Sequence, residues 1–93
     1  MHDLADARIR GSRIDEANAR VTIDIEDAAG RKASLVFDGA RSLDRVAESL
    51  KMAARPGGNL VLHWKPAAPG NTFLYLMDGV VSIWSQKLTV ENE

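Results

Sequence analysis

Apolar and polar residues alternate along several segments of this chain, as they do in β-strands with one buried face. The clearest case is residues 20–26, where Val21, Ile23 and Ile25 alternate with polar residues. A strand places these three β-branched side chains on one face, whereas a helix would scatter them around its circumference. The pattern therefore predicts a strand over residues 20–26.

A further strand is expected on each side of this segment. Residues 8–14 precede it, and simple alternation there puts Ile9 and Ile14 on opposite faces. A β-bulge at Gly11 would return both side chains to one face, because a bulge adds one residue to a strand. Residues 32–37 follow after a turn and alternate again. These three strands are expected to form an antiparallel meander.

The apolar period changes in the middle of the chain and predicts a helix over residues 43–54. Pro56 and two following glycines end this segment, and Ser42 precedes it as the expected N-cap. Its apolar positions follow the i, i+3, i+4, i+7, i+11 spacing of an amphipathic helix. These positions are Leu43, Val46, Ala47, Leu50 and Ala54.

The two-residue period then returns. In residues 59–65, Leu60, Leu62 and Trp64 are expected to share one face of a strand.

Residues 72–77 and 80–89 are expected to pair as a hairpin, because an Asp-Gly pair joins them. A two-residue turn at that pair sets Met77 opposite Val80.

The element order is therefore βββαβββ, in a single domain spanning residues 1–93. A chain of this length buries enough surface for one core. We expect a mainly β (α+β) fold, in which a six-stranded antiparallel sheet forms a sandwich-like or partial-barrel domain and one helix lies between its halves.

The last hairpin is apolar on both faces, although an antiparallel sheet that covers one core should alternate apolar with polar. One face carries Leu74, Leu76, Val81 and Ile83. The other is the candidate interaction face, and it consists of Phe73, Tyr75, Met77, Val80 and Trp84.

Three kinds of cover are compatible with this second face. The helix or a facing sheet of the same chain is one. A partner protein or a second copy of the chain is another, since aromatic residues and Met are enriched in interface cores. A small-molecule pocket lined by Trp84, Tyr75 and Trp64 is the third.

Composition narrows the class of protein. An apolar fraction of 45% and a charged fraction of 27% are typical of a globular domain. No cysteine is present, so neither a disulfide nor a thiolate metal site is expected. The longest apolar run is too short to cross a membrane, and the acidic start lacks a signal-peptide pattern. We expect a cytoplasmic protein without a membrane partner.

The charge is uneven along the chain. Residues 31–65 carry seven basic against three acidic residues, a balance of +4, although the whole chain has a net charge of −1. This pattern favours internal charge balancing over a binding patch. No nucleic-acid partner is expected, because the aromatic residues are not interleaved with the basic ones.

No motif for catalysis, cofactor binding or metal binding occurs in the sequence. The two histidines, His2 and His63, lack a second ligand at a suitable spacing, and no serine lies in a nucleophile elbow. We therefore expect no catalytic, cofactor-binding or metal-binding residues, no cofactor, and no enzymatic activity.

Residues 2–7, residues 33–40 and the closing strand 78–90 resemble a loose group of short uncharacterised bacterial all-β proteins. Some members of that group are immunity proteins of polymorphic toxin systems. The resemblance implies a β fold and a protein that acts by binding another protein.

The sequence thus favours a non-enzymatic protein-binding module whose partner is another protein or a second copy in a homodimer, and the resemblance makes an immunity-like role one form of it. The alternatives are a small-ligand-binding β domain and an enzyme whose site forms at a dimer interface.

Overall fold

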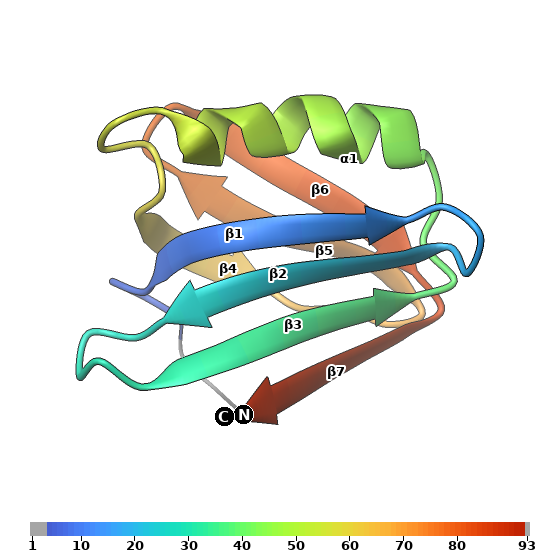
Figure 1. Ribbon diagram of the computed structural model, residues 1–93, viewed down its shortest axis with the longest axis horizontal. Coiled ribbons are helices and arrows are strands. Elements are labelled where there is room, and N and C mark those ends of the chain that lie inside the picture. Colours follow the sequence, from blue (N-terminus) through green and yellow to red (C-terminus); the bar gives the residue numbers. More distant parts are fainter. Residues whose placement is uncertain (1–3, 93) are drawn as a thin grey trace.

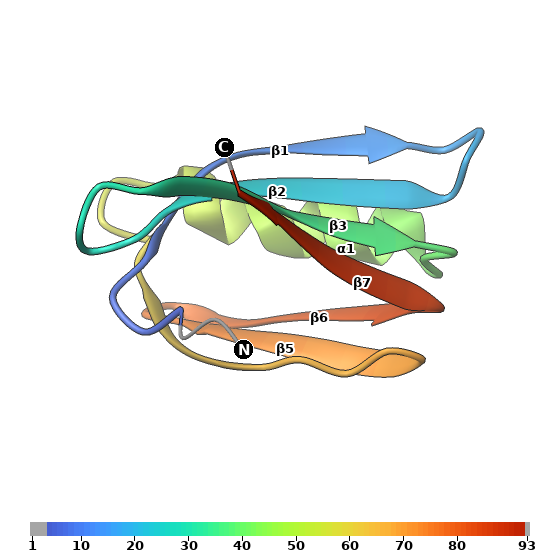
Figure 2. The ribbon, with the colours of Figure 1, turned by 90° about the horizontal axis from the view of Figure 1, so that it is seen from below.

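Two antiparallel sheets pack face to face in the computed structural model, which describes residues 4–92 (Figures 1 and 2). The four-stranded sheet has the order β1-β2-β3-β7, with strands at Arg8–Asp15, Arg20–Glu26, Lys32–Asp38 and Lys87–Asn92. The three-stranded sheet has the order β4-β5-β6, with strands at Val61–Lys65, Gly70–Leu76 and Gly79–Ser85. The mainly β, sandwich-like class is therefore confirmed.

The expected six-stranded sheet is wrong, because residues 80–89 are not one strand. The chain turns a corner at Gln86, so that β6 ends in one sheet and β7 begins in the other. The corner is held where the Gln86 N–H donates to the Asp38 carbonyl oxygen over 2.9 Å. Seven strands in two sheets result, and neither sheet closes into a barrel.

The bulge expected in β1 is confirmed. Ile9 pairs with Ile25 and Gly11 pairs with Asp24, so Arg10 is the additional residue. Beyond the bulge, Ile14 pairs with Val21, and both Ile9 and Ile14 contact the core.

A second bulge, in β4, was not expected. Val61 pairs with Leu76 and Trp64 with Leu74, so both Val61 and Trp64 face the core. Leu62 is the residue displaced by the bulge, and 46% of its surface is exposed. The prediction that Leu62 shares a face with Trp64 is therefore wrong.

The register of the β5–β6 hairpin also differs from the expected one. Leu76 pairs with Gly79, so the turn consists of Met77 and Asp78, and Val80 pairs with Tyr75. A turn at the Asp-Gly pair would need a left-handed Asp78, and Asp78 does not adopt a positive φ. The register shifts by two residues, which leaves every side chain on its expected face.

The helix predicted over 43–54 is confirmed as an α-helix, α1, at Leu43–Leu50 that continues as a 3-10 helix, η1, at Lys51–Ala54. The predicted cap is wrong, because Ser42 has a φ of 55° and its hydroxyl makes no capping hydrogen bond. Helix α1 lies along one open side of the sandwich, beside the edge strands β1 and β6 (Figure 1). It buries Val46 and Leu50 there.

Backbone hydrogen bonds also join the two sheets at the start of β1. The Val61 N–H donates to the Ala7 carbonyl oxygen over 2.8 Å, and the Ile9 N–H donates to Asn59 over 2.9 Å. The N-terminal segment thereby protects the beginning of β4, an edge strand that would otherwise present unpaired backbone groups.

Two fully buried hydroxyl groups, those of Thr72 in β5 and Ser85 in β6, face the core from the β5–β6 hairpin. The Thr72 hydroxyl accepts from the Ala67 N–H and donates to the Ala67 carbonyl oxygen, at 3.1 and 3.0 Å. The Ser85 hydroxyl has no partner among the described residues.

These two hydroxyl groups should respond oppositely to removal. Thr72→Val leaves the Ala67 amide and carbonyl unpaired, so we expect a loss of about 1–3 kcal/mol in the free energy of unfolding. Ser85→Ala removes a buried polar group that gains no hydrogen bond, so we expect unchanged or increased stability. Urea denaturation of both variants measures this, and an equal loss in the two would contradict it.

Gly39 is required at the end of β3 for two reasons. Its φ is 64°, and a Cβ atom there would lie 2.7 Å from Gln86 Cγ and 2.9 Å from Gln86 Cβ. Gly30, in the β2–β3 turn, has a φ of 85° but no atom within 4 Å of such a Cβ. An alanine at Gly30 would therefore meet backbone strain alone, whereas an alanine at Gly39 would meet both backbone strain and a steric clash.

We expect Gly30→Ala to cost about 1 kcal/mol, the usual penalty for a left-handed alanine. Gly39→Ala should cost at least about 1 kcal/mol more, because the Gln86 corner must also move. Thermal or urea unfolding of the two variants gives both values. Equal losses would show that the corner tolerates the added methyl group.

Candidate interaction face

The five residues of the candidate interaction face lie together on the outer surface of the three-stranded sheet. Phe73 and Tyr75 come from β5, Val80 and Trp84 from β6, and Met77 from the turn between these strands. Met77 is 66% exposed and Val80 is 43% exposed, while the three aromatic residues are partly exposed. The hydrophobic pattern thus located a continuous apolar surface.

Strand β4 adds two residues to this surface. His63 alternates with the buried Trp64 and points outward opposite Tyr75, where the two rings stack with their centroids 5.8 Å apart. Tyr75 in turn stacks with Phe73 at 6.3 Å. The exposed Leu62 precedes His63 on the same strand. A row of three rings therefore crosses β4 and β5.

Trp84 is covered on one side by an arginine. The Arg41 guanidinium carbon lies 3.7 Å from the centroid of the indole ring, a cation–π contact. The Arg41 N–H also donates to the Trp84 carbonyl oxygen over 3.1 Å. No local sequence signal marks Arg41, because it meets Trp84 only through the packing of α1 against β6.

Within residues 4–92, no helix or sheet covers the interaction face. The four-stranded sheet packs on the opposite, inner side of β4-β5-β6, and α1 fills the side of the sandwich (Figure 2). The expectation that the helix or a facing sheet covers this surface is therefore wrong for the described residues. The side chain of Arg41 on Trp84 is the internal cover that remains.

The outer surface of the four-stranded sheet is charged and not apolar. Arg10 pairs with Glu26 at 3.2 Å, Arg13 with Asp24 at 3.4 Å, and Arg20 with Asp38 at 2.7 Å. Such pairs keep an exposed sheet surface polar and nearly neutral. Only one of the two outer surfaces is therefore apolar.

A groove of about 300 Å³ borders the interaction face where β6 meets α1. Trp84, Val80 and Ser82 line it from β6, and Asn71 lines it from β5. From the helix side it is lined by Arg41, Ser42, Arg45, Val46 and Ser49.

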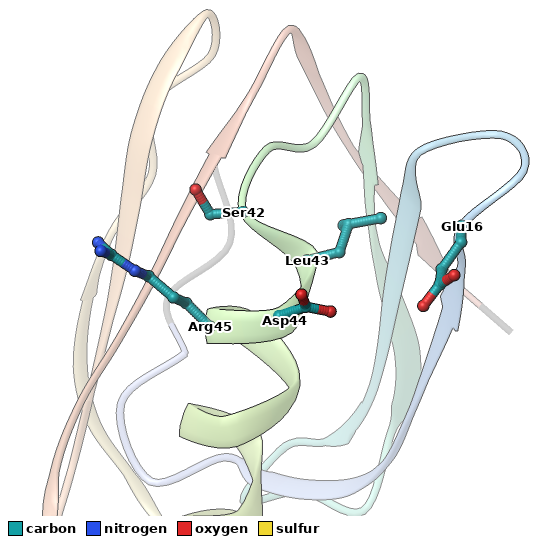
Figure 3. Close-up of a pocket in the computed structure, with 5 residues that line it drawn as sticks. All are labelled: Glu16, Ser42, Leu43, Asp44 and Arg45. Atoms are coloured by element: carbon teal, nitrogen blue, oxygen red, sulfur yellow. The ribbon is translucent and has the colours of Figure 1, made fainter.

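A wider hollow of about 520 Å³ lies at the start of α1, between the helix and the β1–β2 turn (Figure 3). Glu16 and Asp44 contribute its carboxylates, and both are exposed. No hydrogen bond from the Ser42 hydroxyl to either carboxylate is found in the described part of the chain. In Figure 3, Arg45 points away from Glu16, toward β6.

Trp64 does not belong to the small-molecule pocket considered from the sequence. Trp64 is 7% exposed and faces the core, whereas Tyr75 and Trp84 lie on the outer surface of the same sheet. The three side chains therefore cannot line one cavity.

No group of three His, Asp or Glu side chains within residues 4–92 is arranged to hold a metal ion. His63 is engaged in the ring stack, and His2 lies outside the described residues. No helix of the described chain is long and apolar enough to span a membrane. Comparison with known proteins gave no match among family models, curated proteins or solved structures.

Two carboxyl groups, those of Asp15 and Asp27, have lowered pKa values. Both belong to the four-stranded sheet or its turns, away from the interaction face. Asp27 accepts hydrogen bonds from the Arg31 N–H at 2.8 Å and the Ala29 N–H at 2.9 Å. The bond from the Arg31 N–H is the main cause of a lowered Asp27 pKa. Hydrogen bonds from Asn18, the side-chain amide first, likewise lower the pKa of Asp15.

A carboxyl group with a lowered pKa in the folded state stabilises the fold at pH values above its unfolded pKa. That contribution is lost as the pH falls through the folded value. We expect the free energy of unfolding to decline below about pH 4, and Asp27→Asn to flatten part of the decline. Urea unfolding at a series of pH values tests this. A decline of equal steepness in Asp27→Asn would assign it to other groups.

Proposed function

We propose that this chain is a non-enzymatic protein-binding module whose partner docks on the interaction face. The observation that carries the proposal is the apolar outer surface of β4-β5-β6, which no described helix or sheet covers and on which only the Trp84 ring is shielded, by Arg41. The aromatic rings, Met77 and Val80 belong to residue types that bury well in interface cores. Surfaces of this kind on a small domain mark interaction sites.

The shape of the surface favours a protein over a small molecule. The stacked rings of His63, Tyr75 and Phe73 lie on the outer side of a sheet, where no cavity encloses them. A small ligand needs a concave site that buries most of its surface. A protein partner instead needs a broad apolar centre with a polar rim.

An immunity role is one form of this function, in which the partner is a toxin. The resemblance of residues 2–7, 33–40 and 78–90 to a group that includes toxin-immunity proteins supports this form. Neutralisation of a toxin by docking requires surface complementarity and no chemistry, which agrees with the lack of an activated nucleophile in the described residues.

The proposal predicts that acidic substitutions on the face abolish binding. In a double variant with Met77→Asp and Val80→Asp, partner capture from native lysate should fall at least about tenfold, because two charges would be buried in the contact. Both residues are exposed, so the fold should tolerate the changes. Quantitative mass spectrometry of the captured proteins measures the effect.

The matched control carries Ala17→Asp and Ala28→Asp, two exposed positions in the turns of the other sheet. It adds the same charge and should capture the same proteins as the native chain. Equal capture by all three forms would overturn the proposal. A metabolite that co-purifies in stoichiometric amount, with no captured protein, would also overturn it.

A further inference from the structure

Two arginines beside the interaction face have no ion-pair partner among the described residues. Four arginines of the four-stranded sheet and its turns do form ion pairs with carboxylates. The Arg41 guanidinium lies over Trp84, and the side chain of Arg45 extends toward β6 (Figure 3). The positive charge of the middle segment is therefore not fully balanced within the fold.

Both of these arginines line the groove between α1 and β6, and no carboxylate lines it. Val80 and Trp84 supply apolar surface in the same groove, and Asn71 with Ser82 supplies polar groups. The groove thus combines two positive charges, an aromatic ring and hydrogen-bonding side chains.

On the protein-binding function proposed above, we infer that this groove binds an acidic segment of the partner, with carboxylates on Arg41 and Arg45 and an apolar side chain against Trp84 and Val80.

The stack on Trp84 prepares Arg41 for this role. A guanidinium that lies over an indole ring keeps its N–H donors at its edge, where they suit a carboxylate. The Arg41 backbone is also fixed by its hydrogen bond to the Trp84 carbonyl oxygen. An ordered arginine loses less side-chain entropy on binding than a free one.

The charges around the face argue against a second copy of this chain as the occupant. A two-fold dimer places the same surface against itself, so the positive side chains Arg41, Arg45 and Lys65 of both copies would all enter one contact. Glu16 and Asp44 lie toward β1 on the other side of the helix and do not border the groove (Figure 3). Among the described residues, Asp78 places a carboxylate next to Met77 in the exposed β5–β6 turn.

The probe for this inference is a random 12-residue peptide library displayed on phage and selected against the native chain. We expect the selected peptides to be enriched in Asp and Glu beside an aromatic or aliphatic residue. The tightest peptide is then labelled, and its affinity is measured by fluorescence anisotropy.

Arg41→Gln and Arg45→Gln should each weaken this peptide by about tenfold, because each removes a charge-assisted hydrogen bond. Arg55→Gln is the matched control, since Arg55 is exposed, forms no ion pair with a described residue and does not line the groove. It should bind as the native chain does. Circular dichroism of each variant shows whether the fold is kept.

A double-mutant cycle separates a direct contact from a general charge effect. Replacing the acidic residues of the peptide by Gln should cost as much as the arginine variants do, and combining the two changes should add little further loss. Additive losses would overturn the inference. So would a selection without acidic enrichment, or one that yields no binding peptide.

The outcomes also distinguish this inference from the proposed function. Peptides that are lost with the Met77→Asp and Val80→Asp variant but not with the arginine variants would overturn the acidic groove and leave the protein-binding face in place. Sedimentation of the native chain as a dimer that Arg41→Gln dissociates would assign the groove to a second copy and overturn the acidic partner. If lysate capture fails although an acidic peptide binds the groove as expected, that result counts against the proposed function and not against the groove.

Discussion

Every strand must present its apolar residues to one shared core, and three irregularities of the backbone maintain this. The bulge at Arg10 returns Ile14 to the side of Ile9, and the bulge at Leu62 brings both Val61 and Trp64 inward. The corner at Gln86 moves the chain from one sheet to the other. Without these shifts, alternation would carry apolar side chains to the wrong surface, because the side-chain period of a strand is two.

The two bulges were not equally visible in the sequence. In β1, the mismatch between Ile9 and Ile14 around a glycine marks the bulge, so the sequence predicts it. In β4, Leu60, Leu62 and Trp64 form an unbroken alternation, and only the pairing with β5 shows that Leu62 is displaced. The corner at Gln86 leaves a mark in the sequence, because the apolar residues that face the core change from odd positions, such as Ile83, to even positions, such as Leu88.

The interaction face was predictable as a set of residues, because a register shift of two leaves each side chain on its face. Its surroundings were not. The stack of His63 on Tyr75 depends on how β4 pairs with β5, and the contact of Arg41 with Trp84 depends on where α1 packs. Both are contacts between elements, which the periodicity of one segment does not encode. The sequence likewise left the cover of the face open, because alternation does not determine the layers that surround a sheet.

The two outer surfaces of the sandwich differ: one is polar and charge-paired, and the other is apolar. On the four-stranded sheet, Arg13 and Arg20 meet carboxylates on neighbouring strands, so charge and hydrogen bonding are satisfied within the fold. On the three-stranded sheet, apolar side chains stay exposed and the bordering arginines find no carboxylate in the described chain. Stability alone gives no reason for this difference, because polar residues at exposed strand positions serve a monomer equally well. The partner proposed above, which brings both apolar surface and negative charge, would account for the two departures together.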